Sequence, residues 1–122
     1  MSELFSPPRF AVEARGREAL SYDIKQGSDL TDPKVQAVVD AQLNEANPDL
    51  LVVCPTCIHR GGWEHLNCCY RSPLGTAMLL KKSREQIRFS IRQIRKQLAS
   101  GGEVMFEHPW GSDLRNQVEI CA

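Results

Sequence analysis

A continuous run of apolar residues, LLVVC at Leu50 to Cys54, constrains the fold of this chain more than any other stretch. A short apolar run without alternation is typical of a strand that is covered on both faces of a parallel sheet. Segments with helical periodicity precede and follow the run, and parallel strands need such crossovers between them. The run therefore predicts a small open α/β sheet, mostly parallel, with flanking helices.

Three further strands and three helices complete the predicted fold. The strands are expected in residues 3–6 (ELFS), 19–24 (ALSYDI) and 103–107 (EVMFE), and the last two contain a carboxylate near their end. Asp32 and Pro33 form a helix start, as an N-cap and a first helical residue, and Val35, Val38, Val39 and Leu43 then recur at helical spacing. A short helix is expected in residues 9–17, and a long one from Leu74 to Leu98 with Gly101-Gly102 after it. The apolar stripe of the long helix is formed by Leu80, Ile87, Ile91, Ile94 and Leu98.

Length and charge favour one soluble domain that spans residues 1–122. The 122 residues are enough for a single hydrophobic core, and 15 basic and 15 acidic residues give no net charge that would attract nucleic acid or membrane. No stretch approaches the roughly 18 apolar residues of a membrane span, and the N-terminus has no signal-peptide pattern. Four of the five cysteines lie between Cys54 and Cys69. Such clustering fits a reducing compartment, so we expect a protein of the cytoplasm or nucleus.

Chemically useful residues follow the predicted strands. Asp23 ends the second strand, Cys54 to Cys57 follow the third, and Glu107 to Trp110 follow the fourth. The loop at Ser6 follows the first. In open parallel sheets, ligands bind beyond the carboxyl ends of the strands. These four segments therefore predict one site at a single sheet edge, in which Glu107 is expected to be a buried acid.

The same segments resemble the ordered motifs of a known family. They read Leu4-Phe5-Ser6, Tyr22-Asp23-Ile24, Gly27-Ser28-Asp29-Leu30, Pro55-Thr56-Cys57 and Phe106-Glu107-His108-Pro109. In this order they are similar to motifs of the DNA cytosine-5 methyltransferases. The chain also resembles the methyltransferase-like segment of retroelement polyproteins, where Ser-Pro-Pro-Arg near the start and Glu-His-Pro near the end recur. The resemblance implies a Rossmann-like methyltransferase fold with strand order 2-1-4-5 in the family's numbering.

The resemblance also implies a role for individual residues. Cys57 matches the nucleophile and Glu107 the assisting acid, while the cofactor S-adenosylmethionine would be bound by Phe5, Ser6, Asp23 and Asp29. DNA or RNA, and other segments of a larger polyprotein, are the implied partners. Pro7 and Pro8 stand where the family has glycines, and proline has no N–H to offer a cofactor. The pattern therefore fits either a fragment of a larger protein or a relative of the fold that has lost methyl transfer.

A zinc site is the alternative interpretation of the cysteine-rich loop. Cys54-x2-Cys57 and His65-x2-Cys68 supply four sulfur and nitrogen ligands of the kind that structural zinc takes, with His59 and Cys69 as further candidates. In this interpretation the chain is a non-catalytic zinc-stabilised or protein-interaction module. Purely structural roles also remain open for single residues. Asp23 suits a turn or cap, and Cys57 suits a buried position at the end of a strand.

The long helix carries a strongly basic segment. Between Lys81 and Lys96 there are seven basic residues and one acidic residue, Glu85. Such a segment could neutralise phosphates, which makes Arg84, Arg88, Arg92 and Arg95, with Trp110 as a base-stacking residue, the candidate nucleic-acid contacts. A solvated helix face gives the same pattern.

Overall fold

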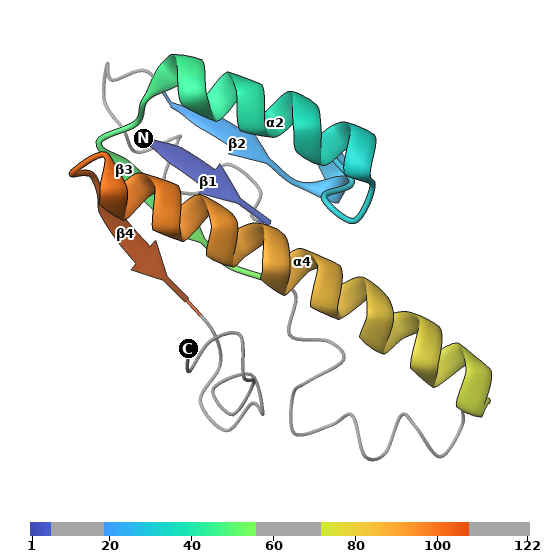
Figure 1. The fold of residues 1–122 in the computed structure, drawn as a ribbon. Helices are drawn as coiled ribbons and strands as arrows, with labels where there is room; N and C mark the ends of the chain where they lie inside the picture. Colours follow the sequence, from blue (N-terminus) through green and yellow to red (C-terminus); the bar gives the residue numbers. More distant parts are fainter. Residues whose placement is uncertain (6–18, 56–71, 108–122) are drawn as a thin grey trace.

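The structure is a computed structural model that describes residues 1–5, 19–55 and 72–107. Its centre is an all-parallel sheet of four short strands (Figure 1). The strands are β1 (Ser2–Leu4), β2 (Leu20–Tyr22), β3 (Leu50–Val53) and β4 (Glu103–Phe106), in the order β2-β1-β3-β4. The α/β class is thereby confirmed. The expected order 2-1-4-5 is in the numbering of the methyltransferase family, and the correspondence of β3 and β4 to its fourth and fifth strands stays a prediction.

The two main helices begin and end close to the predicted residues. Helix α2 (Pro33–Ala46) follows the N-cap Asp32, whose Oδ1 accepts from Lys34 N at 2.9 Å, and ends at Asn47 in the left-handed region. Helix α4 (Pro73–Ala99) has Ser72 as its N-cap, and a short 3-10 turn, η1 (Ile24–Gln26), follows β2. The helix expected in residues 9–17 lies outside the described residues. None of the helices in the described ranges is long and apolar enough to cross a membrane.

Both helices lie side by side on the same face of the sheet (Figure 1). This arrangement follows from the strand order, because the crossovers β2-α2-β3 and β3-α4-β4 run in the same direction and right-handed crossovers then place their helices on one face. The core between the helices and the sheet is made of Leu4, Tyr22, Leu30, Val39, Leu43, Leu51, Val53 and Phe89.

The buried faces of the helices are more polar than expected. Val38 and Leu98, predicted to face the core, are 57% and 58% exposed. Buried amides stand in the interface instead: Gln36 Nε2 donates to the carbonyl of Leu30 at 2.8 Å, and Gln97 Nε2 to that of Pro48 at 2.6 Å. Burial is tolerated because each of these amides donates a hydrogen bond.

A carboxylate bridges the two helices. Asp40 Oδ1 on α2 accepts hydrogen bonds from Gln93 Nε2 at 2.7 Å and Lys96 Nζ at 2.6 Å on α4. Partial burial opposes the charged form of Asp40, but the hydrogen bonds from Lys96 and Gln93, with the nearby positive charges, outweigh it and hold the pKa below its ordinary value. Asp40 is therefore ionised at neutral pH and ties α2 to α4.

This bridge predicts a pH dependence of stability. A carboxyl whose pKa is lower in the folded than in the unfolded chain stabilises the fold above the unfolded pKa, and this stabilisation is lost as pH falls through the folded pKa. Asp40→Asn should therefore cost about 0.5–1 kcal/mol at pH 7, because the pair is partly exposed, and the difference should shrink below about pH 4. Urea unfolding at several pH values measures it, with Glu45→Gln, an exposed change on the same helix, as control. A difference that stays constant down to about pH 2.5 would contradict the assignment.

Candidate functional site

The carboxyl ends of the strands meet at one edge of the sheet. Backbone hydrogen bonds continue the ladder past the strand ends, from Phe5 N to Tyr22 O at 2.8 Å, from Cys54 N to Leu4 O at 3.1 Å, and from Glu107 N to Val53 O at 3.0 Å. Asp23 follows β2 at the same edge. Asp23, Cys54 and Glu107 therefore lie at the same edge of the sheet, as expected, but of the three only Asp23 lines the cavity described below. The loop from Ser6 to Arg9 lies outside the described residues.

A cavity of about 260 Å³ opens at the ends of β1 and β2. It brings together three of the four predicted cofactor residues, Phe5, Asp23 and Asp29. The opposite wall comes from α4, which contributes Lys82, Ser83 and Gln86. Sequence reasoning missed this wall. The available signal was helix length: the 27 residues of α4 span about 40 Å, far more than a four-residue strand, so the helix must extend beyond the sheet (Figure 1).

Asp23 has a structural role and remains available for a second one. Its Oδ2 accepts from Lys25 N at 3.3 Å, and its carbonyl accepts from Gln26 N and Ser28 N, so it caps the 3-10 turn η1. This is the turn role that the sequence left open. Among the residues that the structure describes, no hydrogen bond to Oδ1 is found, so this oxygen can still accept from a ligand that enters the cavity.

Asp29 shapes the loop that leads into α2. Its Oδ1 accepts from Thr31 Oγ1 at 2.6 Å and from Thr31 N at 3.0 Å. These bonds, the side-chain bond first, lower the pKa of Asp29 against the opposing effect of burial, and the positive charge of Lys82 adds to the shift. Asp29 therefore contributes a fixed negative charge to the cavity while its hydrogen bonds hold the loop.

Phe5 stands at the end of β1 in a backbone conformation that is rare for its type. Its φ of 61° lies in the left-handed region that favours glycine, and its side chain packs against the core. Such local strain recurs at ligand-binding sites, where the surrounding structure holds it in place. Phe5 thus supplies an apolar wall to the cavity from a constrained position.

The predicted catalytic and zinc residues are only partly described. Cys57, His65, Cys68 and Trp110 lie outside the described residues, as does Ser6 of the cofactor set. Cys54 is half-buried, and within residues 1–5, 19–55 and 72–107 no group of three or more metal-ligating side chains is found. Glu107 is exposed, so the expectation of a buried acid was wrong. The reason is that β4 is the outermost of the strands in the described residues, where Met105 and Phe106 are exposed as well.

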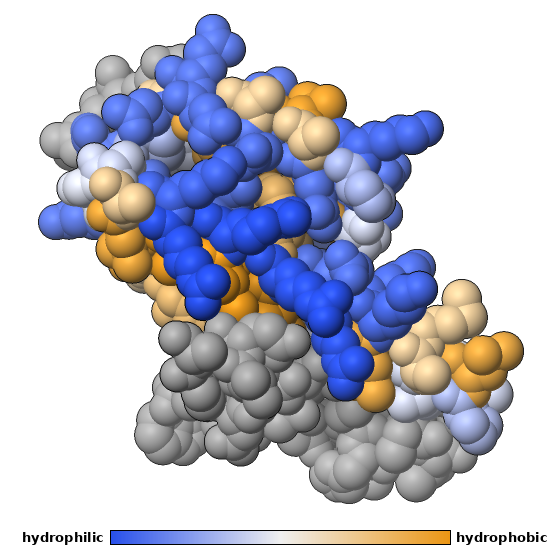
Figure 2. All heavy atoms as spheres, viewed as in Figure 1, coloured by the Kyte–Doolittle hydropathy of each residue, from blue (hydrophilic) through white to orange (hydrophobic). Residues whose placement is uncertain are grey.

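The basic residues of α4 divide into two groups. Arg84, Arg88 and Arg95 are exposed and share one face of the helix by their spacing, with Arg88 in contact with Glu85 at 3.4 Å. Arg92 is exposed as well, but it reaches α2, where it donates to Gln36 Oε1 at 2.9 Å, and it lies over the Phe89 ring. Strongly hydrophilic side chains accordingly gather along α4 in Figure 2.

The carboxyl-edge cavity can accept a ligand with hydroxyl groups and a flat apolar part. Asp23 offers an acceptor, Phe5 and Ile24 offer apolar contacts, and Lys82 offers a donor on the opposite wall. Comparisons with protein-family models, curated proteins and solved structures find no match to this chain. The function therefore has to follow from the site itself.

Proposed function

We propose that this chain is a methyltransferase-like domain of Rossmann type that acts on nucleic acid, related to the DNA cytosine-5 methyltransferases and to the methyltransferase-like segment of retroelement polyproteins. One observation carries the proposal. Asp23 ends the second strand of a parallel sheet and lines a cavity at the carboxyl edge. In nucleotide-binding sheets, an acid after a strand of this kind binds the ribose hydroxyls.

The cavity suits part of S-adenosylmethionine. Its volume of about 260 Å³ is just below the range of roughly 300–1,000 Å³ for drug-sized ligands, so it fits the nucleoside part. Asp23 Oδ1 would accept from the ribose, while Phe5 and Ile24 would contact the adenine. S-adenosylmethionine supplies an electrophilic methyl group when bound. The residues at Ser6, Cys57 and His108 would complete the site from segments outside the described ranges.

The proposed chemistry uses Cys57 and Glu107. The Cys57 thiolate forms a bond to C6 of a cytosine ring, which leaves an electron pair on C5 able to take a methyl group. Glu107, which follows β4 beside β3, would offset the charge that develops near N3. Loss of the C5 proton to a base and release of the thiolate restore the ring. The exposure of Glu107 leaves room for a base to approach it.

The exposed arginines suit the phosphates of the nucleic acid. Arg84, Arg88 and Arg95 lie on one face of α4, the helix that also lines the cavity. Contacts of this type release counterions, so binding of an oligonucleotide should weaken steeply as salt is raised. Trp110 would stack on a base at the same edge.

Calorimetry with S-adenosylmethionine tests the cofactor half of the site. We expect saturable binding, about tenfold weaker in Asp23→Asn, because the variant loses a charged acceptor for the ribose hydroxyls. Asparagine still caps η1, so the fold should be kept. Glu45→Gln, which removes an exposed charge far along α2, should bind as the unmutated protein does. Absence of binding by the unmutated protein would remove methyl transfer from the proposal.

Trapping with a 5-fluorocytosine oligonucleotide tests the nucleophile. In the presence of S-adenosylmethionine, the unmutated protein should form a covalent adduct visible by mass spectrometry. Cys57→Ser should form none, whereas Cys54→Ser, the matched change at the end of β3, should retain it. An adduct that survives Cys57→Ser would exclude this thiol. Metal analysis of the same preparation tests the zinc alternative, which requires about one zinc per chain.

A further inference from the structure

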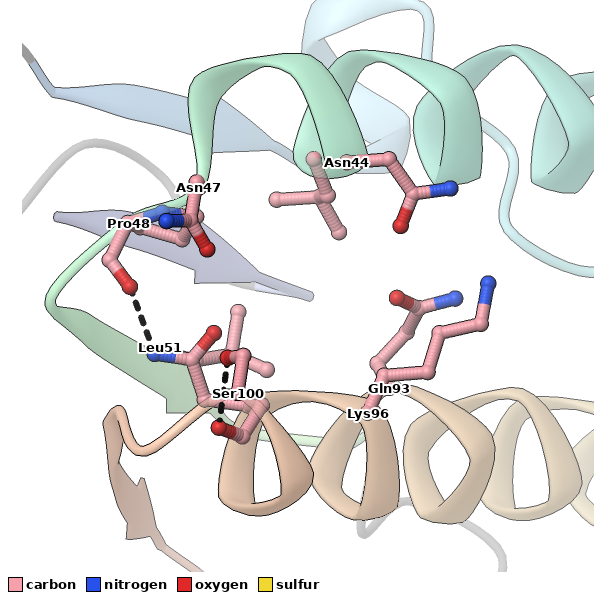
Figure 3. A pocket seen from close by; sticks show the side chains of 9 residues that line it. Asn44, Asn47, Pro48, Leu51, Gln93, Lys96 and Ser100 are labelled. Atoms are coloured by element: carbon pink, nitrogen blue, oxygen red, sulfur yellow. Dashed lines mark hydrogen bonds between the residues drawn. The ribbon is translucent and has the colours of Figure 1, made fainter.

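A second cavity lies away from the carboxyl-edge site, in the interface between α2 and α4. Its volume is about 310 Å³, and its polar lining consists of Gln36, Asp40, Arg92, Gln93 and Lys96. A smaller cavity of about 90 Å³ shares Gln93 and Lys96 with it and continues to Asn44 and Asn47. Figure 3 shows Gln93 and Lys96 reaching from α4 toward Asn44 on α2. The larger cavity, lined by Gln36, Asp40 and Arg92, forms a polar groove between the two helices.

Arg92 is held in place from two sides. Its Nη2 donates to Gln36 Oε1 at 2.9 Å, and its Cζ lies 5.6 Å from the centre of the Phe89 ring. Gln36 is only 8% exposed and is itself fixed by the bond from its Nε2 to Leu30 O at 2.8 Å. A guanidinium has several N–H groups, and only one of them is used by Gln36. The remaining donors are therefore pre-positioned beside the cavity.

The charges around this cavity favour an anion. Lys96 Nζ contacts Asp40 Oδ1 at 2.6 Å, so one cation offsets the one carboxylate of the lining. Arg92 is the second cation of the lining and leaves it with an excess positive charge. Gln93, 4% exposed, donates to the same Asp40 oxygen at 2.7 Å and thereby reduces the negative potential that Asp40 presents to the cavity.

We propose that the groove between α2 and α4 binds the phosphate group of a small phosphomonoester, with Arg92 and Lys96 as its cationic ligands. A guanidinium matches the geometry of phosphate oxygens, and an ammonium adds a second charge beside it. A phosphate group has enough oxygens to accept from Arg92 and from a remaining N–H of Lys96 at the same time, whereas a carboxylate has only two, so phosphate is the preferred anion. The proposal is independent of methyl transfer.

Titration with inorganic phosphate, followed by amide chemical shifts at constant ionic strength, tests this site. We expect saturable shifts confined to residues 33–47 and 89–100, and weaker ones with acetate. Arg92→Gln and Lys96→Gln should each weaken phosphate binding about tenfold, because each removes a charged donor. Asp40→Asn should strengthen it several-fold, because it removes the one opposing charge. A purely structural bridge between the helices predicts no such gain.

Lys81→Gln is the matched control, since it removes an exposed positive charge from the same helix away from the cavity. It should leave the phosphate affinity unchanged. If Lys81→Gln weakens phosphate binding equally, the affinity comes from the overall positive charge of α4 and the proposal is wrong. Equal affinities for phosphate and acetate would exclude a site that uses both Arg92 and Lys96. Arg92→Lys keeps the positive charge but loses the planar guanidinium, so this variant should bind phosphate with intermediate affinity. The absence of saturable shifts in the unmutated protein would overturn the proposal outright.

Discussion

Replacing Phe89 with alanine is expected to lower the free energy of unfolding by about 3–5 kcal/mol, the usual cost of deleting a large buried ring. Phe89 is 1% exposed and is the residue of α4 in the central core cluster. The substitution would leave a hole under α4 and would also remove the ring beneath Arg92. Small domains have total stabilities of only about 5–15 kcal/mol, so the loss should be visible in any urea unfolding curve.

Leu98→Ala provides the control for Phe89→Ala. Leu98 is on the same helix, has a similar apolar character and is 58% exposed, so its truncation should change stability by no more than about 0.5 kcal/mol. Phe89→Leu should fall between the two because it keeps part of the buried volume. If Phe89→Ala and Leu98→Ala cost the same, α4 does not pack on the sheet in the way described.

The positions of the elements were largely predictable because their ends are marked by local chemistry. Asp32 and Pro33 define the start of α2 through an N-cap and a missing N–H. Gly101, with φ of 82°, ends α4 in the left-handed conformation that glycine adopts without strain. The apolar run before Cys54 became the central strand β3, with neighbours on both sides. Each of these signals depends only on residues that are close together in the sequence, so it can be recognised without knowledge of the structure.

The inward faces of the helices were not predictable in the same way. Apolar periodicity placed Val38 and Leu98 toward the core, yet Gln36 and Gln97 are buried instead. A glutamine is stable there only because a specific acceptor from another element stands within reach, such as Pro48 O for Gln97. Periodicity cannot show which distant carbonyl will be available, since that depends on the packing of α2 against α4.

In the candidate site, too, some residues could be predicted from the sequence and others could not. Asp23 could be identified because it ends a predicted strand, and Asp29 was named through the family resemblance. Lys82 could not be identified, because its place depends on how far α4 extends past the strands. The apolar character of β4 suggested a buried Glu107, but β4 is the outermost strand among the described residues, and an outer strand is covered less than a central one. Strand order, rather than composition, decides that exposure.

Gly102→Ala is expected to destabilise the protein by about 2–3 kcal/mol through displacement of Gln97. A Cβ added at Gly102 would overlap with the side-chain amide of Gln97. That amide donates to Pro48 O at 2.6 Å and is 6% exposed, so moving it leaves buried polar groups without their bond. An unsatisfied buried group costs about 1–3 kcal/mol. Thermal or urea unfolding of the variant measures the effect.

A double-mutant cycle separates this steric cause from a backbone cause. In a Gln97→Ala background the three side-chain atoms nearest to the added Cβ are absent, and Gly102→Ala should cost less than about 0.5 kcal/mol. Gly101→Ala is the matched comparison, because a Cβ there touches nothing and the cost of about 1–2 kcal/mol comes from its positive φ. That cost should be the same in both backgrounds. If Gly102→Ala also costs the same in both, the adjacent glycines serve one backbone turn, and Gln97 does not explain the second of them.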